Sequence, residues 1–117
     1  MRDYNLYLQD IFKAIQKIER YTLNLSYDDF IKDELKQDGV IRNLEIIGEA
    51  VKNLPDEIKN NHTAIEWRKI AGIRDILIHA YFYVDMKIIW DIITLKIPEF
   101  KKKVLEIWNN DNFSEKG

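Results

Sequence analysis

The segment IAGIRDILIHAYFYV, residues 70–84, is the most apolar run of the chain, and the rest of the fold must be built around it. This segment nevertheless contains the ionisable side chains Arg74, Asp75 and His79, followed by Tyr81. A buried charge without a partner costs several kcal/mol, so charges inside apolar segments are usually paired or functional. We therefore expect these polar side chains to carry the function of the protein.

The composition predicts an all-α protein. The chain has 117 residues, which fits one domain spanning residues 1–117, and a domain of this size buries roughly two-thirds of its unfolded surface. It has only four glycines and two prolines, and no segment alternates apolar and polar residues at period two. We therefore expect no sheet. The last residues, 109–117, are polar, and we expect them to form a frayed tail.

Charge and cysteine usage exclude several classes of protein. The net charge of −2 excludes a globally basic nucleic-acid binder, so any RNA contact must depend on a local basic site. The absence of cysteine excludes disulfides and thiolate metal sites. The N-terminus does not resemble a signal peptide, and no stretch reaches the ~18 apolar residues of a membrane span. We expect a cytoplasmic protein that has no membrane partner.

Apolar residues at three- and four-residue spacing predict the main helices. These helices cover residues 3–22, 33–54 and 63–79, and a further helical region follows Asp85. Pro98 ends or kinks that last region, or begins a new helix.

Local signals predict where helices begin and where they pack closely. Ser26 with Asp29 resembles a capping box before a short helix, Asp85 is a good cap, and Thr63 with Glu66 forms the standard box that should start the 63–79 helix. Two glycines inside the second helix, Gly39 and Gly48, suggest that another backbone approaches closely at those positions.

The spacing of the polar residues permits two interpretations. Asp75 and His79 are four apart and can touch on one helix face, while Arg74 and His79 lie about 140° apart around an ideal helix. In the first interpretation Asp75 and His79 are a structural pair and Arg74 extends to solvent. In the second interpretation arginine binds a phosphate and histidine transfers protons, which permits RNA cleavage without a metal. A two-fold dimer would supply the second acid or base that one His79 lacks.

The remaining polar residues carry weaker predictions. Glu45 and Glu49 can pair with Arg74 from the neighbouring helix, and His62 is expected to be a plain solvated residue. Asp75 either orients His79 or only makes the site more polar. The lysine run at 101–103 is a solvated face or an RNA-backbone contact. A dimer could also gather cations around one groove: Arg42, Arg68, Lys69 and Arg74.

A family resemblance covers nearly the whole chain. It rests first on RDILIHAY, in which Arg74 is followed after four residues by His79 and then by Tyr81. The flanking segments that carry it further are YLQDIFKAIQKIERYT (7–22), NLEIIGEAVKNLP (43–55), IEWRKIAGIR (65–74) and YFYVDMKIIWDII (81–93). With these segments the sequence resembles the HepT-like branch of the HEPN superfamily.

The resemblance implies an up-and-down bundle of four to five helices that forms a homodimer with its motif helices at the two-fold axis. It implies a metal-independent endoribonuclease that is the toxin of a type VII (HEPN/MNT) toxin–antitoxin system and needs no cofactor. Arg74 and His79 would be catalytic and Asp75 supporting. Tyr81 would accept AMP from a partner nucleotidyltransferase of the MNT type, the antitoxin, with which a higher assembly is possible.

An alternative from a different class remains open at this point. In it the chain is a non-catalytic helical module that binds nucleotide or docks the nucleotidyltransferase, with Arg74 as a phosphate anchor. A third and simpler possibility is a structural dimerisation bundle, in which Arg74 and His79 affect only stability.

Overall fold

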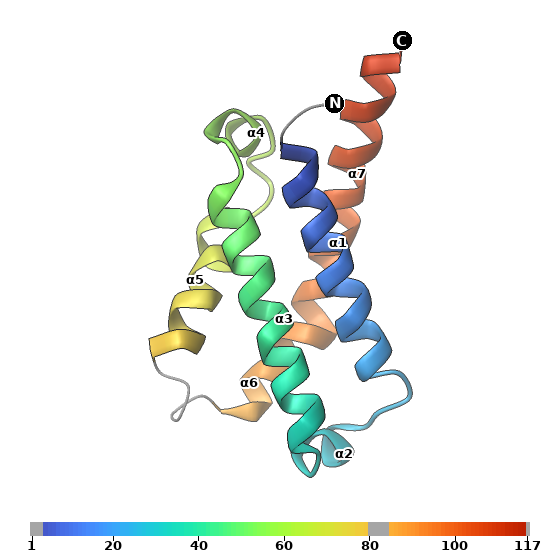
Figure 1. Cartoon of the computed structure of the whole chain (residues 1–117), viewed down its shortest axis with the longest axis vertical. Helices are drawn as coiled ribbons and strands as arrows, with labels where there is room; N and C mark the ends of the chain where they lie inside the picture. The colour runs from blue at the N-terminus through green and yellow to red at the C-terminus, as the bar shows by residue number, and fades with distance from the viewer. Residues whose placement is uncertain (1–3, 80–84, 117) are drawn as a thin grey trace.

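The computed structural model describes residues 4–79 and 85–116 and shows a helical bundle, as the sequence predicts (Figure 1). No strand occurs in that part of the chain. Its helices, in chain order, are α1 (Tyr4–Tyr21), α2 (Tyr27–Ile31), α3 (Glu34–Asn53), α4 (Asp56–Asn61), α5 (Trp67–His79), α6 (Met86–Asp91), the π-helical turn η2 (Ile92–Lys96) and α7 (Ile97–Lys116).

Helix α3 is the centre of the bundle, with α1 packed on one side and α5 on the other (Figure 1). The apolar stripe of each long helix faces this centre, as its three- and four-residue spacing requires. The side chains that are almost fully buried include Leu8, Ile11 and Ile15 of α1, Leu44 and Ile47 of α3, and Val104 and Ile107 of α7. The core therefore holds α3 in place, and α3 in turn supports α5.

Gly48 sets how closely α5 approaches α3. A Cβ atom added at Gly48 would lie 2.6 Å from the Cβ of Arg74 and 3.2 Å from the backbone nitrogen of Arg74. The predicted close approach of another backbone is therefore confirmed at Gly48. At Gly39 the neighbour is instead the ring of Tyr21, 3.0 Å from such a Cβ, so that glycine accommodates a side chain.

Two of the three predicted helix starts are confirmed. Ser26 accepts a hydrogen bond from the backbone of Asp29, whose carboxylate accepts one from the Ser26 backbone N–H, and Asp85 caps α6. The prediction that Thr63 and Glu66 start the next helix is wrong. Helix α5 begins only at Trp67, and the backbone carbonyl of Glu66 accepts the first hydrogen bonds of this helix.

The physical reason lies in the packing of residues 63–66. The indole Nε1 of Trp67 donates to the carbonyl of His62 at 3.0 Å, and Ile65 is buried. These two contacts hold the segment in a turn, and the carboxylate of Glu66 pairs with Lys69 at 2.6 Å. Non-local packing thus overrides the local capping signal.

Of the outcomes predicted for Pro98, the start of a new helix agrees best with the structure. The chain stays helical from α6 through η2 into α7, and Pro98 is the second residue of α7. Proline has no N–H and crowds the preceding turn, and a π-helical turn is one way in which a helix absorbs such a disturbance. Helix α7 also keeps a helical backbone to Lys116, and the frayed tail expected over residues 109–117 stays a prediction. No glycine or proline lies between Pro98 and Gly117 to stop this helix.

Much of α5 stays uncovered in the single chain. The sequence predicts a helix that is buried on most sides, yet only Trp67 and Leu77 of α5 are buried. Ile76 is 60% exposed and Ile78 is 44% exposed. Among the described helices, none is both long enough and apolar enough to cross a membrane.

Candidate functional site

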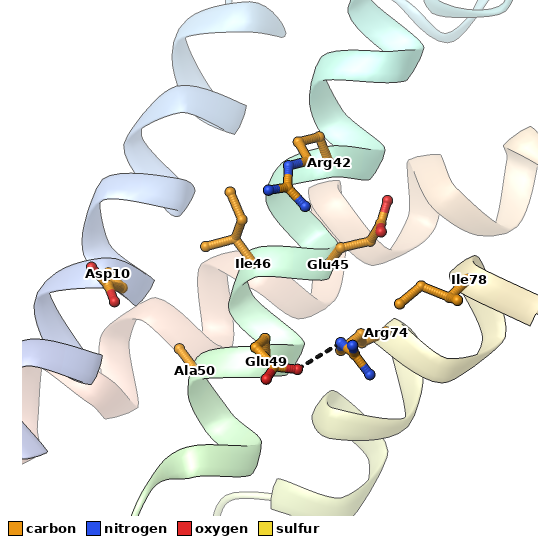
Figure 2. Close-up of a pocket in the computed structure, with 8 residues that line it drawn as sticks. All are labelled: Asp10, Arg42, Glu45, Ile46, Glu49, Ala50, Arg74 and Ile78. Atoms are coloured by element: carbon orange, nitrogen blue, oxygen red, sulfur yellow. Dashed lines mark ion pairs between the residues drawn. The ribbon is translucent and has the colours of Figure 1, made fainter.

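Arg74 lies on the side of α5 that faces α3, where the close approach at Gly48 brings its backbone near. Its Nε is 2.7 Å from Oε2 of Glu49, as Figure 2 shows, and its Nη1 is 3.4 Å from Oδ1 of Asp75. Of the two predicted partners on α3, Glu49 is confirmed. Within the part of the chain that the structure describes, Glu45 lines the same pocket but makes no ion pair with Arg74.

The two carboxylates orient the guanidinium group more than they stabilise the fold. The Arg74 side chain is 29% exposed and the Glu49 side chain 49% exposed, and ion pairs this close to solvent contribute little, about 0–1 kcal/mol. Nε is occupied by Glu49, and Nη1 donates to Asp75 at 3.4 Å, so the remaining N–H groups of Nη1 and Nη2 are the part of the fork left to bind a phosphate.

His79 is the last residue of α5, and it is exposed. The sequence allows a contact between Asp75 and His79, but over residues 4–79 and 85–116 the structure records neither a hydrogen bond nor an ion pair between them. Asp75 is exposed and pairs with Arg74 instead. The structure thus supports an orienting role of Asp75 for Arg74 and leaves the imidazole of His79 open to solvent. Tyr81 lies outside the described residues.

A pocket of about 230 Å³ surrounds Arg74 (Figure 2). It is lined by Arg42, Glu45, Ile46, Glu49 and Ala50 of α3, Arg74 and Ile78 of α5, and Asp10 of α1. Two cations and three carboxylates therefore face this space. Asp10 was missed by the sequence analysis, because nothing local shows that α1 reaches this point.

Within the single chain, the four cations that a dimer was expected to gather lie in two places. Arg42 and Arg74 line the pocket just described, whereas Arg68 and Lys69 line another groove at the start of α5. Of the lysine run, Lys101 pairs with Glu19 at 3.0 Å and Lys103 with Glu99 at 3.2 Å. Both contacts fit a solvated face.

Comparison with known proteins now adds to this geometry. Residues 11–107 match the family model described as "Ribonuclease HepT-like". The chain belongs to the HepT-like family. This match includes both Arg74 and His79, and it confirms the resemblance seen in the sequence.

Relatives of this HepT-like chain cover most of its length. A "Probable ribonuclease HepT" of Thermococcus cleftensis is 47% identical over 87% of this chain and 93% of the relative. A "Putative RNase" of Caldanaerobacter subterraneus subsp. tengcongensis is 46% identical over 86% of this chain and 90% of its own length. A "Gamma-glutamylcyclotransferase and putative RNase" of Methanocaldococcus jannaschii is 43% identical over 91% of this chain, which spans only 48% of that relative. No solved structure matches the chain.

Among the described residues, no three His, Cys, Asp or Glu side chains are grouped so that they could hold a metal ion.

Proposed function

We propose that this chain is an RNA endonuclease in which Arg74 and His79 of α5 carry the chemistry. The observation that carries the proposal is the site itself. An arginine oriented by Glu49 and an exposed histidine lie on one helix, in a chain that matches the HepT-like ribonuclease model over residues 11–107. The names of the relatives agree with this activity.

The proposed reaction needs one base, one acid and one cation. A base removes the proton of the ribose 2′-OH, and the 2′ oxygen attacks the adjacent phosphorus. The bond between phosphorus and the 5′ oxygen breaks, and an acid protonates that leaving oxygen. The products are a 2′,3′-cyclic phosphate and a 5′-OH. Arg74 would stabilise the negative charge that builds up on the phosphate oxygens.

A homodimer would supply the two proton-transferring groups. One chain offers one His79, so the second role requires a second copy across a two-fold axis. Exposed Ile76 and Ile78 on α5 support this arrangement, because large apolar side chains left exposed on one helix often mark an interface. Ile76→Glu should therefore convert the dimer to a monomer in sedimentation and also abolish cleavage.

The proposal extends to regulation as the toxin of a type VII toxin–antitoxin pair. Tyr81 follows His79 by two residues, and AMP added to its hydroxyl would bring a negative charge and a bulky group near Arg74. An MNT-type nucleotidyltransferase would be the partner. Co-expression with such an enzyme should raise the intact mass in steps of one AMP, and Tyr81→Phe should remove the gain.

The decisive test compares the two histidines of the chain. His79→Ala and Arg74→Ala should each abolish RNA cleavage while the helical circular dichroism spectrum stays unchanged. His62→Ala is the matched control and should keep full activity, because only the backbone carbonyl of His62 accepts the bond from Trp67. Full cleavage by a folded His79→Ala protein would refute the proposal. No cleavage of any RNA by the wild-type dimer would favour the non-catalytic nucleotide-binding or docking module instead.

A further inference from the structure

A second groove lies further along α3 and α5, beyond the Arg74 site. The two helices pack side by side in opposite directions, and the pair of Glu49 and Arg74 joins them (Figure 1). One turn further along α3, Lys52 lines this second groove together with Ala71 of α5. The groove has a volume of about 560 Å³ and is bordered by α4 at its far side.

The charges that line this groove are mostly positive, and we call it the basic groove. Its cations are Lys52, Lys59, Arg68 and Lys69, and its carboxylates are Asp56 and Glu66. The whole chain carries a net charge of −2, so a local excess of positive charge is not a consequence of composition.

Hydrogen bonds and ion pairs occupy only part of this positive charge. Lys69 pairs with Glu66 at 2.6 Å, and Nζ of Lys59 lies 3.5 Å from the carbonyl of Lys52. In the part of the chain that the structure describes, the charged ends of Lys52 and Arg68 make no ion pair, and both residues are exposed. These two cations are therefore available to an anionic ligand.

The positions of Lys52 and Arg68 relative to Arg74 indicate which anionic ligand they would bind. Lys52 follows Glu49 by three residues, about 4.5 Å along α3, and Arg68 precedes Arg74 by six residues, about 9 Å along α5. A strand whose reacting phosphate lies at Arg74 would carry its next phosphates past Lys52 and Arg68.

The lining of the groove favours contacts to the backbone of RNA over contacts to its bases. Trp67 is the aromatic residue that lines it, but Trp67 is buried and its N–H donates to His62. Base recognition on single strands needs exposed aromatic faces, whereas lysine and arginine bind phosphates without regard to sequence.

We propose that the basic groove binds the phosphate backbone of the RNA substrate beside the cleaved bond, with Lys52 and Arg68 as the contacts. This assignment rests on the proposed ribonuclease function and extends it, because it places substrate binding outside the motif that carries the chemistry. Binding should be independent of sequence and strongly dependent on salt.

The experiment uses the full-length protein and the double variant Lys52→Ala/Arg68→Ala. Affinity for a labelled 12-nucleotide single-stranded RNA is measured over a range of salt concentrations in a His79→Ala background, and kcat and KM are measured with His79 intact. The matched control is Lys17→Ala/Arg20→Ala, which removes one exposed lysine and one exposed arginine from α1, away from the basic groove.

The double variant should bind RNA about tenfold or more weakly at low salt. The slope of log affinity against log salt should fall by about 1.4, since each phosphate contact on a single strand contributes about 0.7. KM should rise while kcat stays constant, and the control should stay within twofold of the wild type.

The outcomes separate this inference from the proposed function. If the wild-type protein cleaves RNA but the double variant has an unchanged KM and salt slope, the basic groove does not bind the substrate. The proposed ribonuclease function would then still hold. If RNA binding weakens in the double variant but the wild type cleaves no RNA, the basic groove binds RNA and the proposed ribonuclease function is refuted. A wild-type protein that neither binds nor cleaves RNA would overturn both.

Discussion

Replacing Gly48 by alanine tests whether the contact between α3 and α5 holds the site together. The added methyl carbon would lie 2.6 Å from the Cβ of Arg74, whereas carbon atoms in contact normally lie about 3.5–4.0 Å apart. The backbone nitrogen of Arg74 is also only 3.2 Å away, so rotating a side chain cannot relieve the clash. The two helices must therefore separate by about 1 Å.

The cost can be worked out from two opposing terms. Overpacking a closely packed contact costs about 1–3 kcal/mol, and replacing glycine by alanine inside a helix returns up to about 1 kcal/mol. We expect Gly48→Ala to lower the free energy of unfolding by about 1–2 kcal/mol, measured in urea. The rate of RNA cleavage should fall by more than this loss of stability alone would cause, because the same separation lengthens the 2.7 Å contact between Arg74 and Glu49.

Gly72 provides the matched control on α5 itself. A Cβ atom at Gly72 would meet no atom within 4 Å, so Gly72→Ala should stabilise the chain by up to about 1 kcal/mol. A Gly48→Ala protein as stable as the wild type would refute the packing argument. A loss of stability at Gly72 would show that a second chain covers this part of α5.

Two further predictions concern charged and capping groups. Glu49→Gln should change the free energy of unfolding by less than about 1 kcal/mol, since its pair with Arg74 is partly exposed. The same variant should lower kcat about tenfold or more, because Arg74 loses its orientation. An unchanged kcat would contradict this prediction. Ser26→Ala should cost about 1 kcal/mol in thermal unfolding at neutral pH. Hydrogen bonds from the Ser26 hydroxyl and backbone hold the pKa of Asp29 below its usual value, so this carboxylate contributes stability above its unfolded pKa. The difference in unfolding free energy between Ser26→Ala and the wild type should therefore become smaller as pH falls below about 4. A difference that stays constant with pH would contradict this prediction.

Much of the fold could be predicted because the signals are local. The apolar spacing in residues 3–22 and 33–54 depends on helical period alone, and the observed helices α1 and α3 agree within one residue at each end. The caps at Ser26 and Asp85 bond to backbone atoms two or three residues away, so their partners are already present in the sequence.

The error at Thr63 arose where packing decides. The Thr63 box has the right local pattern, but the bond from Trp67 to the carbonyl of His62 and the burial of Ile65 hold that segment in a turn. A capping signal contributes about 1 kcal/mol, which tertiary packing can exceed. At Pro98 the sequence left several outcomes open, and the start of a new helix agrees best with α7, which begins at Ile97.

The sequence by itself determined the all-α class, the family and the placing of Arg74 and His79 on one helix, because helical spacing and motif order need no distant contact. Only the tertiary structure decided that Glu49 and not Glu45 pairs with Arg74, since that choice depends on where the two helices meet at Gly48. The tertiary structure also separated Arg42 from Arg68. Residues far apart in the chain become neighbours only when helices pack. Glu45 and Glu49 are equally possible partners of Arg74 in the sequence, and the packing of α3 against α5 decides between them.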